Sequence, residues 1–323
     1  SNNVPKQAIK DACGAYKKFF NGKAKHPTFK SKKGTVPSFY QDPLKIRFTA
    51  TRVKVEGFAE NKRKNKQQLN WIRLVEKDRI PRGKGVKYVN PRIRFDGLHW
   101  WISVGVIVYT CQEYSKNEGI GIDLGLINLG ICSDGAVYPN INKTKKVRTL
   151  EKKKRRLQRK VSRKYQSNME GERYKKTCNI IKSEQQLITI SRRLTNIRQN
   201  YLHQITSEIV NRKPRFIVLE DLNVSGMMKN KHLAKAVQQQ KFHEFRRQVE
   251  YKSERNGVQF ILADRWYPSS KLCFQCGQLK KDLKLSDRLY ICPCGNRTDR
   301  DVQAALNLKR YGEKSTTCLR ISM

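Results

Sequence analysis

Acidic residues adjoin three apolar segments that lie far apart in the sequence. They are Asp123 in segment 119–125, Glu220 at the end of segment 215–220, and Asp301 just before segment 302–308. Carboxylates at the ends of buried elements lose hydration and repel one another, so their charge requires compensation. Hard divalent cations such as Mg²⁺ or Mn²⁺ prefer carboxylate oxygens and supply that compensation. In a strongly basic chain, this pattern indicates phosphodiester cleavage by two metal ions about 3.5–4 Å apart.

Four of the nine cysteines form two closely spaced pairs. They are Cys273, Cys276, Cys292 and Cys294, and a glycine follows each pair. This spacing matches a zinc ribbon, in which four thiolates bind Zn²⁺ tetrahedrally at about 2.3 Å. Four unrelated cysteines would rarely adopt it, and four thiolates leave no open position for a catalytic zinc. We therefore predict a structural Zn²⁺ site in a reducing compartment, and no disulfide framework.

The charge of the chain favours a polyanionic partner. The 323 residues include 69 Lys and Arg against 27 Asp and Glu, a formal net charge of +42. Nucleic acid fits best, because phosphate contacts neutralise the self-repulsion and release counterions. A ribosomal or histone-like scaffold is the simplest alternative, but it needs neither buried acids nor a cysteine cluster.

A membrane partner fits the sequence less well. Basic residues are spread along the whole chain, and no apolar run approaches the roughly 20 residues that span a bilayer. No signal peptide is visible. Because the sequence opens on Ser1 and not on Met, we expect the natural protein to begin earlier.

The hydrophobic pattern predicts a β-rich part followed by an α/β part. Residues 8–20 have the period of a helix, and residues 44–108 alternate as strands do, with Asp96 and Gly97 as a hairpin turn. This β-rich stretch predicts a small barrel. From residue 119 onward, apolar strands alternate with helices, which predicts an α/β core that carries the acids.

Residues 144–182 form an exceptionally basic helical segment, and a second amphipathic helix follows from Leu187 to Ile205. A run of charge is usually a solvated face. Charge of one sign destabilises a helix, however, so bound phosphates explain this run better. We predict nucleic-acid contacts at Lys152, Lys153, Arg155, Arg156, Arg159 and Lys160.

Six short motifs follow one another in a characteristic order along the chain. They are 121–125 (GIDLG), 218–227 (VLEDLNVSGM), 245–252 (FRRQVEYK), 267–270 (YPSS), the four cysteines and 299–301 (DRD). In this order they resemble the TnpB family, the RNA-guided nucleases of IS200/IS605-type transposons, whose relatives include the compact type V CRISPR effectors. The resemblance covers most of the chain from Gly119 onward, and residues 8–33 resemble part of the recognition region of the family.

The resemblance implies a catalytic triad that binds Mg²⁺ or Mn²⁺. It consists of Asp123, Glu220 and Asp301, because the second acid of the Asp-Arg-Asp motif is the ligand in the family and so ranks ahead of Asp299. Glu220 likewise ranks ahead of Asp221. Family motifs also place Arg246, Arg247 and Arg300 among the predicted nucleic-acid contacts.

The resemblance further implies the partners and the reaction. They are a transposon-derived guide RNA and a double-stranded DNA target beside a short flanking motif, and the DNA is cleaved. The protein reads the motif while base pairing reads the sequence. A monomer without membrane partners is expected, in the prokaryotic cytoplasm and nucleoid-associated when bound to DNA.

The expected fold is α/β, with an RNase H-like (RuvC) core, a preceding wedge-like β-barrel, a partial helical recognition region and an inserted zinc ribbon. The boundaries are recognition region 1–42, barrel 43–117, core 118–266 with basic helices 144–212, target-binding zinc ribbon 267–296, and last core segment 297–323.

Three positions depart from the family pattern without removing a ligand. Ile127 stands where a basic residue is common, Gln303 where Asn is common, and the second cysteine pair is Cys-x-Cys. Three alternatives remain. A nuclease-inactive RNA-guided repressor is disfavoured because all three acids are present. A compact type V CRISPR effector would be separated by its genomic neighbours. A transposase that itself joins DNA strands fits less well with the zinc ribbon and the basic helices.

Overall fold

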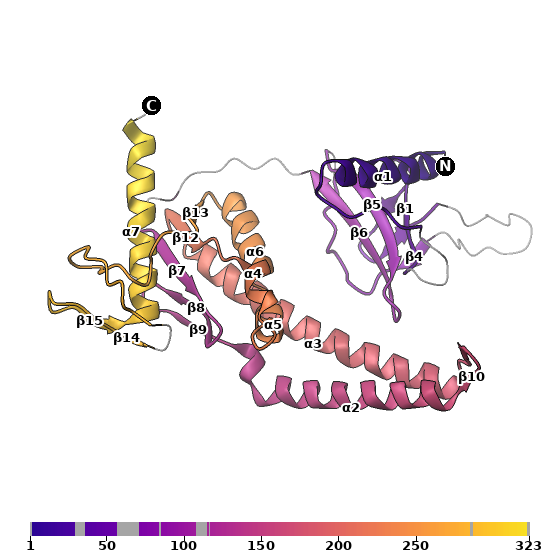
Figure 1. The fold of residues 1–323 in the computed structure, drawn as a ribbon. Coiled ribbons are helices and arrows are strands. Elements are labelled where there is room, and N and C mark those ends of the chain that lie inside the picture. The colour runs from indigo at the N-terminus through magenta and orange to yellow at the C-terminus, as the bar shows by residue number, and fades with distance from the viewer. Residues whose placement is uncertain are drawn as a thin grey trace, which may run out of the picture. The chain divides into compact units, whose positions relative to one another are not determined.

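The computed structural model describes residues 2–29, 36–56, 71–83, 85–107, 115, 117–284 and 287–321, with side chains up to residue 315. The chain divides into two compact units, Ser1–Tyr109 and Thr110–Met323 (Figure 1). Each unit is described by itself. Within the described ranges, no helix has the length and apolar character needed to cross a membrane. The finer five-part division remains a prediction.

The first unit contains one helix and two antiparallel sheets. Helix α1 covers Asn3–Phe20. One sheet has the order β1-β5-β6, with β1 (Ser38–Tyr40), β5 (Lys87–Phe95) and β6 (Trp100–Ile107). The other has the order β2-β3-β4, with β2 (Arg47–Phe48), β3 (Arg52–Lys54) and β4 (Trp71–Arg73).

The predicted hairpin turn is confirmed. Strands β5 and β6 pair antiparallel on either side of Asp96 and Gly97. The Asp96 carboxylate accepts hydrogen bonds from the backbone N–H groups of Leu98 (3.0 Å) and His99 (2.8 Å), and Gly97 has a φ of 93°. A side chain at position 97 would strain this left-handed backbone, so glycine is favoured there.

The predicted closed barrel is not found among the described strands of residues 43–117. Two sheets of three strands each are present, and one apolar cluster joins them. Its buried members are Ile46, Val53, Val55 and Ile93. Alternating side chains thus bury one face of each short sheet, and three strands are too few to close a barrel around a filled interior.

The second unit is built on a five-stranded sheet of order β13-β12-β7-β8-β9. Strands β7 (Ile120–Leu124), β8 (Asn128–Cys132) and β9 (Val137–Pro139) form an antiparallel meander. Strand β12 (Phe216–Glu220) pairs parallel with β7, and β13 (Gln259–Ala263) pairs parallel with β12. The carboxyl ends of β7, β12 and β13 therefore share one edge, so acids that end these strands come together there.

Both faces of this sheet are covered. In β12, Ile217 and Leu219 pack into a cluster with residues of α3 (Cys178–Asn211) and α6 (Phe242–Arg255), while Phe216 and Val218 join Leu308 of α7 (Arg300–Ile321). Successive residues of a strand point to opposite faces. The unbroken apolar run therefore indicates a strand between two helical layers, as Figure 1 shows.

The predicted basic helices are confirmed as a helical hairpin. Helix α2 (Lys145–Ser167) follows the short helix η1 (Ile141–Lys143), and the strands β10 (Met169–Glu170) and β11 (Arg173–Tyr174) connect α2 to α3. Val147 of α2 packs against Ile190 and Leu194 of α3. One apolar stripe on α2 is therefore enough to anchor it, and the rest of its surface is free for charge.

The remaining elements come before and after β13 in the sequence. Helices α4 (Val224–Lys229) and α5 (Ala234–Gln240) follow β12, and the antiparallel strands β14 (Leu289–Ile291) and β15 (Arg297–Asp299) precede α7.

Candidate functional site

Two of the predicted catalytic acids lie at the carboxyl ends of neighbouring parallel strands. Strand β12 pairs with β7 so that Leu219 lies opposite Ile122. Both of these side chains are fully buried, while Glu220 and Asp123, the next residues along each strand, are half-buried. The register therefore carries the two carboxylates to the same sheet edge, as parallel pairing requires.

Helix α7 brings the third acid to this edge. The helix crosses β7 at Gly121, where a β-carbon would lie 2.2 Å from the carbonyl oxygen of Ala305 and 2.3 Å from the backbone nitrogen of Lys309. Only glycine permits this approach. Asp301 stands in the first turn of α7 and lies near the guanidinium groups of Arg300 (3.3 Å) and Arg288 (3.6 Å).

Asp299 has a different environment from Asp301. Its carboxylate accepts hydrogen bonds from the backbone N–H groups of Asp301 (2.9 Å) and Val302 (3.3 Å). It thereby caps the start of α7, a position that short acidic side chains favour. Asp299 is thus engaged with the backbone, while the Asp301 carboxylate lies against the guanidinium groups of Arg300 and Arg288.

The acids influence one another electrostatically. Burial, followed by the charges of Glu220 and Asp301, raises the pKa of Asp123 well above its usual range, although Arg300 opposes this. Burial also raises the pKa of Glu220, with a further contribution from Asp301. The cluster therefore favours protons or cations over free carboxylates, as a hard cation site does.

Ser269 is a contact of this site that sequence reasoning missed. Its hydroxyl donates a hydrogen bond to Oε1 of Glu220 and opposes the rise in the pKa of that carboxyl. The segment 267–270 (YPSS) was recognised as a motif, but no role followed from the residue types alone. The serine lies 49 positions from Glu220, so only the fold reveals the contact.

Asp221, the residue after Glu220, is paired with two arginines. Its carboxylate pairs with Arg246 (3.0 Å) and Arg265 (2.7 Å). Asp221 therefore takes part in an ion-pair fork. The predicted nucleic-acid contact Arg246 is engaged in it, Arg247 pairs with Glu244 (2.8 Å), and Arg300 lies against Asp301.

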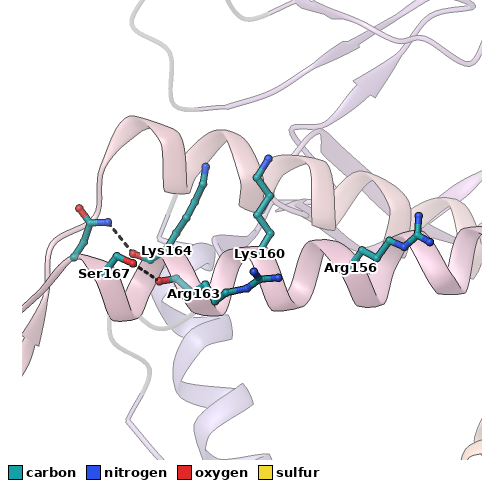
Figure 2. Close-up of a pocket in the computed structure, with 6 residues that line it drawn as sticks. Arg156, Lys160, Arg163, Lys164 and Ser167 are labelled. Carbon is teal, nitrogen blue, oxygen red and sulfur yellow. Dashed lines mark hydrogen bonds between the residues drawn. The ribbon is translucent and has the colours of Figure 1, made fainter.

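The six predicted contacts on helix α2 are all exposed to solvent. They are Lys152, Lys153, Arg155, Arg156, Arg159 and Lys160. Further along the same helix, an open cleft of about 470 Å³ is lined by Arg156, Lys160, Arg163, Lys164, Ser167 and Asn168 (Figure 2). Of these, only Arg156 and Lys160 were predicted. Their spacing of three, four and seven places them on one helical face, a signal that could have extended the prediction.

Lys164 is fixed within this cleft. Its ammonium group donates to the carbonyl of Asn179 (2.9 Å) and to the hydroxyl of Ser183 (2.8 Å) on α3. The side chain of Asn168 donates to the Lys164 carbonyl, and Ser167 donates to the Arg163 carbonyl, as Figure 2 shows. The cleft therefore has an ordered end at the tip of the hairpin.

The four predicted zinc cysteines come together in space. Cys273 lies 3.6 Å from Cys294 and Cys276 lies 3.5 Å from Cys292, measured between sulfurs. Within the part of the chain that the structure describes, they are the one group of three or more His, Cys, Asp or Glu residues whose ligand atoms all lie within 4.8 Å of one another. The three acids are less tightly grouped. The quartet could hold a metal ion.

The local hydrogen bonds favour thiolate at Cys273. Burial raises the pKa of Cys273, but the backbone N–H of Cys276 and the amide of Asn296 outweigh it and lower the pKa to about 6. At Cys292 the backbone N–H of Cys294 lowers the pKa, yet burial and the neighbouring thiols bring it to about 12. A metal ion binds the deprotonated form, so one ligand is available near neutral pH.

Two family models match the chain. The model described as "Probable transposase" matches residues 106–231, which include β7, the helical hairpin and β12. The model described as "Cas12f1-like, TNB domain" matches residues 242–308, which include the four cysteines and Asp301.

Two similar relatives extend over nearly the whole chain. A protein of Streptomyces pristinaespiralis named "Putative RNA-guided DNA endonuclease" is 28% identical over 319 residues, 98% of this chain and 73% of that protein. The Escherichia coli K12 protein InsQ, which bears the same name, is 28% identical over 330 residues, 97% of this chain and 75% of that protein.

A solved structure shows a similar fold. The chain matches the protein in the cryo-EM structure of a Cas12f1–sgRNA–target DNA complex with a TM-score of 0.57 and 15% identity, over 91% of this chain and 67% of that one. The family models, the relatives and this fold agree with the motif order in the sequence. The chain therefore belongs to the TnpB family.

Proposed function

We propose that this protein is an RNA-guided DNA endonuclease whose cutting site is formed by Asp123, Glu220 and Asp301. Two contacts carry the proposal. Strands β7 and β12 pair in parallel and have Asp123 and Glu220 at their carboxyl ends, and helix α7, which carries Asp301, packs against β7 at Gly121. The order and direction of the five strands support an RNase H-like (RuvC) core. The names of the similar relatives support the activity.

The donor set of the acidic edge fits hard divalent cations. All three candidate ligands offer carboxylate oxygens. Burial, and after it the charge of neighbouring acids, raises the pKa of Asp123 and of Glu220, and a bound cation would compensate both effects. When bound, Mg²⁺ or Mn²⁺ supplies activation of water and stabilisation of the leaving 3′ oxygen. The protein orients the carboxylates: Ser269 holds Glu220, and Asp299 fixes the first turn of α7 that carries Asp301.

The cysteine quartet fits a structural Zn²⁺. Four sulfurs within reach of one ion fill a tetrahedral shell and leave no position for substrate. The quartet would hold the loops between β13 and α7 in one conformation. Such a zinc ribbon would present the exposed Lys281 and Lys284 to nucleic acid.

The helical hairpin is suited to bind the phosphate backbone of the guide. Six exposed basic side chains precede or line the cleft near Arg163 on helix α2. Positive charges repeated along one helix suit the repeated phosphates of a polyanion better than one small anion. The formal charge of +42 requires such a partner. The guide would then pair with one strand of target DNA.

The test uses protein purified from cells that co-express the RNA transcribed beside its gene. The RNA that remains bound is sequenced, and the complex is challenged in Mg²⁺, with EDTA as control, with plasmids that carry a matched target beside randomised flanks. We expect one flanking motif to be depleted, and depletion to require RNA. Asp123→Ala should abolish cutting and retain the RNA.

A matched control variant shows whether cleavage is lost because the proposed site is damaged or because any carboxylate is removed. Asp134→Ala removes a carboxylate from the turn between β8 and β9, where it pairs with Arg212 beyond the end of β8 that is opposite to the acidic edge. It should cut as wild type does. Cutting by Asp123→Ala would refute the site. RNA-dependent binding without cutting by wild type would identify a repressor, and absence of any bound RNA would refute the guided function.

A further inference from the structure

A continuous set of hydrogen bonds connects the acidic edge to the cysteine quartet. It begins where the hydroxyl of Ser269 donates to Glu220. The carbonyl of Ser269 accepts from Nδ2 of Asn307 at 2.7 Å, and the same nitrogen donates to the carbonyl of Leu272 at 2.7 Å. Helix α7 thus fixes the backbone of the segment that carries Ser269.

The second half of the set reaches the cysteines. Nε2 of Gln303 donates to the carbonyl of Leu272 at 2.7 Å, and its Oε1 accepts from Nδ2 of Asn296 at 3.0 Å. The same Asn296 nitrogen lies 3.5 Å from the sulfur of Cys273. The two ends of the Gln303 side chain therefore join the two halves of the network.

The members of this network are buried. Ser269 and Asn296 are 5% exposed, and Gln303 and Asn307 are fully buried. The loss of a hydrogen-bond partner destabilises a buried amide, so the bonds made by Gln303, Asn296 and Nδ2 of Asn307 are preferred over a rearranged set, although Oδ1 of Asn307 has no partner among the described residues. Burial also excludes water as a substitute partner. A displacement at Cys273 is therefore transmitted to Ser269 more readily than through a solvated loop.

We infer that Ser269 is a positioning residue for Glu220, and that Asn307, Gln303 and Asn296 make its position depend on the cysteine quartet. The inference rests on the proposed cation site at the acids. It implies that an ion in the quartet and an ion at the acids bind with a coupling free energy, which acts in both directions. The ribbon then has a role in the cutting site besides any contact with DNA.

The first test measures the affinity of the protein for Mn²⁺ from the electron paramagnetic resonance signal of free Mn²⁺. Ser269→Ala should weaken Mn²⁺ binding by about 10–100-fold, the effect of removing a partner that orients a ligand. Ser269→Thr keeps the hydroxyl and should restore most of the affinity. Zinc content, measured by atomic emission, should stay at the wild-type value in both variants.

A matched control removes a buried hydroxyl elsewhere. The hydroxyl of Ser253, on α6, is buried without a hydrogen-bond partner in the described part of the chain. Ser253→Ala should bind Mn²⁺ as wild type does. An Ser269→Ala variant with wild-type Mn²⁺ affinity, or an equal loss in Ser253→Ala, would overturn the inference.

The second test breaks the network without touching Ser269 or Glu220. Gln303→Leu removes the bridge between Leu272 and Asn296 and should weaken Mn²⁺ binding, by less than Ser269→Ala does. Gln248→Leu is its control, since Gln248 is also fully buried and bonded to Thr206 and Glu244, on the other face of the sheet. Equal affinities of the two leucine variants for Mn²⁺ would overturn the coupling.

The same titration separates this inference from the proposed function. Asp123→Ala should abolish the Mn²⁺ binding that Ser269→Ala weakens. If Asp123→Ala binds Mn²⁺ as wild type does, the proposed cation site fails. If Asp123→Ala loses binding while Ser269→Ala does not, the site stands and only the positioning role is refuted.

Discussion

Substitution of Gly121 by alanine should separate the three proposed catalytic acids without removing any of them. The β-carbon at this position would lie 2.2, 2.3 and 2.9 Å from backbone atoms of Ala305, Lys309 and Leu308 in α7. Backbone inside a helix cannot rotate away as a side-chain tip can. Helix α7 must therefore move as a body, and Asp301 in its first turn moves with it.

The displacement can be worked from these distances. Ordinary van der Waals contact begins at 3.4 Å, so the closest atom must recede from 2.2 Å by about 1.2 Å. A misplacement of about 1 Å can reduce a reaction rate about 100-fold, which is the loss of cleavage we expect. Overpacking of this kind costs about 1–3 kcal/mol, which lowers the Tm of a unit of this size by about 2–12 °C.

The assay compares single-turnover cleavage rates and Tm values of Gly121→Ala and Gly130→Ala. Gly130 lies on the adjacent strand β8, where a β-carbon would meet the side chain of Ile122 at 3.3 Å, a contact that relaxes within a few tenths of an ångström. Gly130→Ala should cleave within about threefold of wild type. The reasoning is refuted if Gly121→Ala keeps both the Tm and the cleavage rate of this control.

Two further perturbations test the charges of the site and of the hairpin. Burial raises the pKa of Asp123, so the stability associated with its proton is present below the unfolded pKa and is lost as pH rises through the folded pKa. In EDTA, Asp123→Asn should therefore raise the Tm relative to wild type at pH 8 and by much less at pH 4.5; an offset that does not vary with pH would contradict this. Arg163→Ala in the cleft of α2 should lower the slope of log affinity for the guide RNA against log salt by about one, in filter-binding titrations from 50 to about 300 mM KCl. An unchanged slope would place Arg163 outside the RNA contact, and Lys235→Ala on α5 serves as a matched loss of one cation.

The acids could be predicted from sequence because their positions follow local rules. A short apolar run that ends in a carboxylate indicates a buried strand with a functional end, and helices between such runs imply parallel neighbours. Asp123 and Glu220 lie where these rules place them. The cysteine quartet is equally local, since two knuckles need only the right spacing within each pair.

Ser269 and the arginine fork at Asp221 could not be found in this way. Each depends on a contact between residues 25–49 positions apart, and neither a serine in a loop nor an arginine on a helix has a period or spacing in the sequence that identifies its partner. The prediction of a closed barrel in the β-rich first unit was wrong for a related reason. Alternation predicts strands and their buried faces, but it does not count the strands that pair in one sheet. The sequence was therefore compatible with a barrel as well as with two small sheets.

The docking of α7 against β7 also has a consequence for synthesis of the protein on the ribosome. Asp301 is translated about 180 residues after Asp123, which at about 5–20 residues per second is a delay of about 10–40 seconds. During that interval β7 presents a bare glycine surface at Gly121, and the basic hairpin of α2 and α3 has already emerged. A nascent chain would thus carry the proposed RNA-binding hairpin before the proposed cutting site is complete.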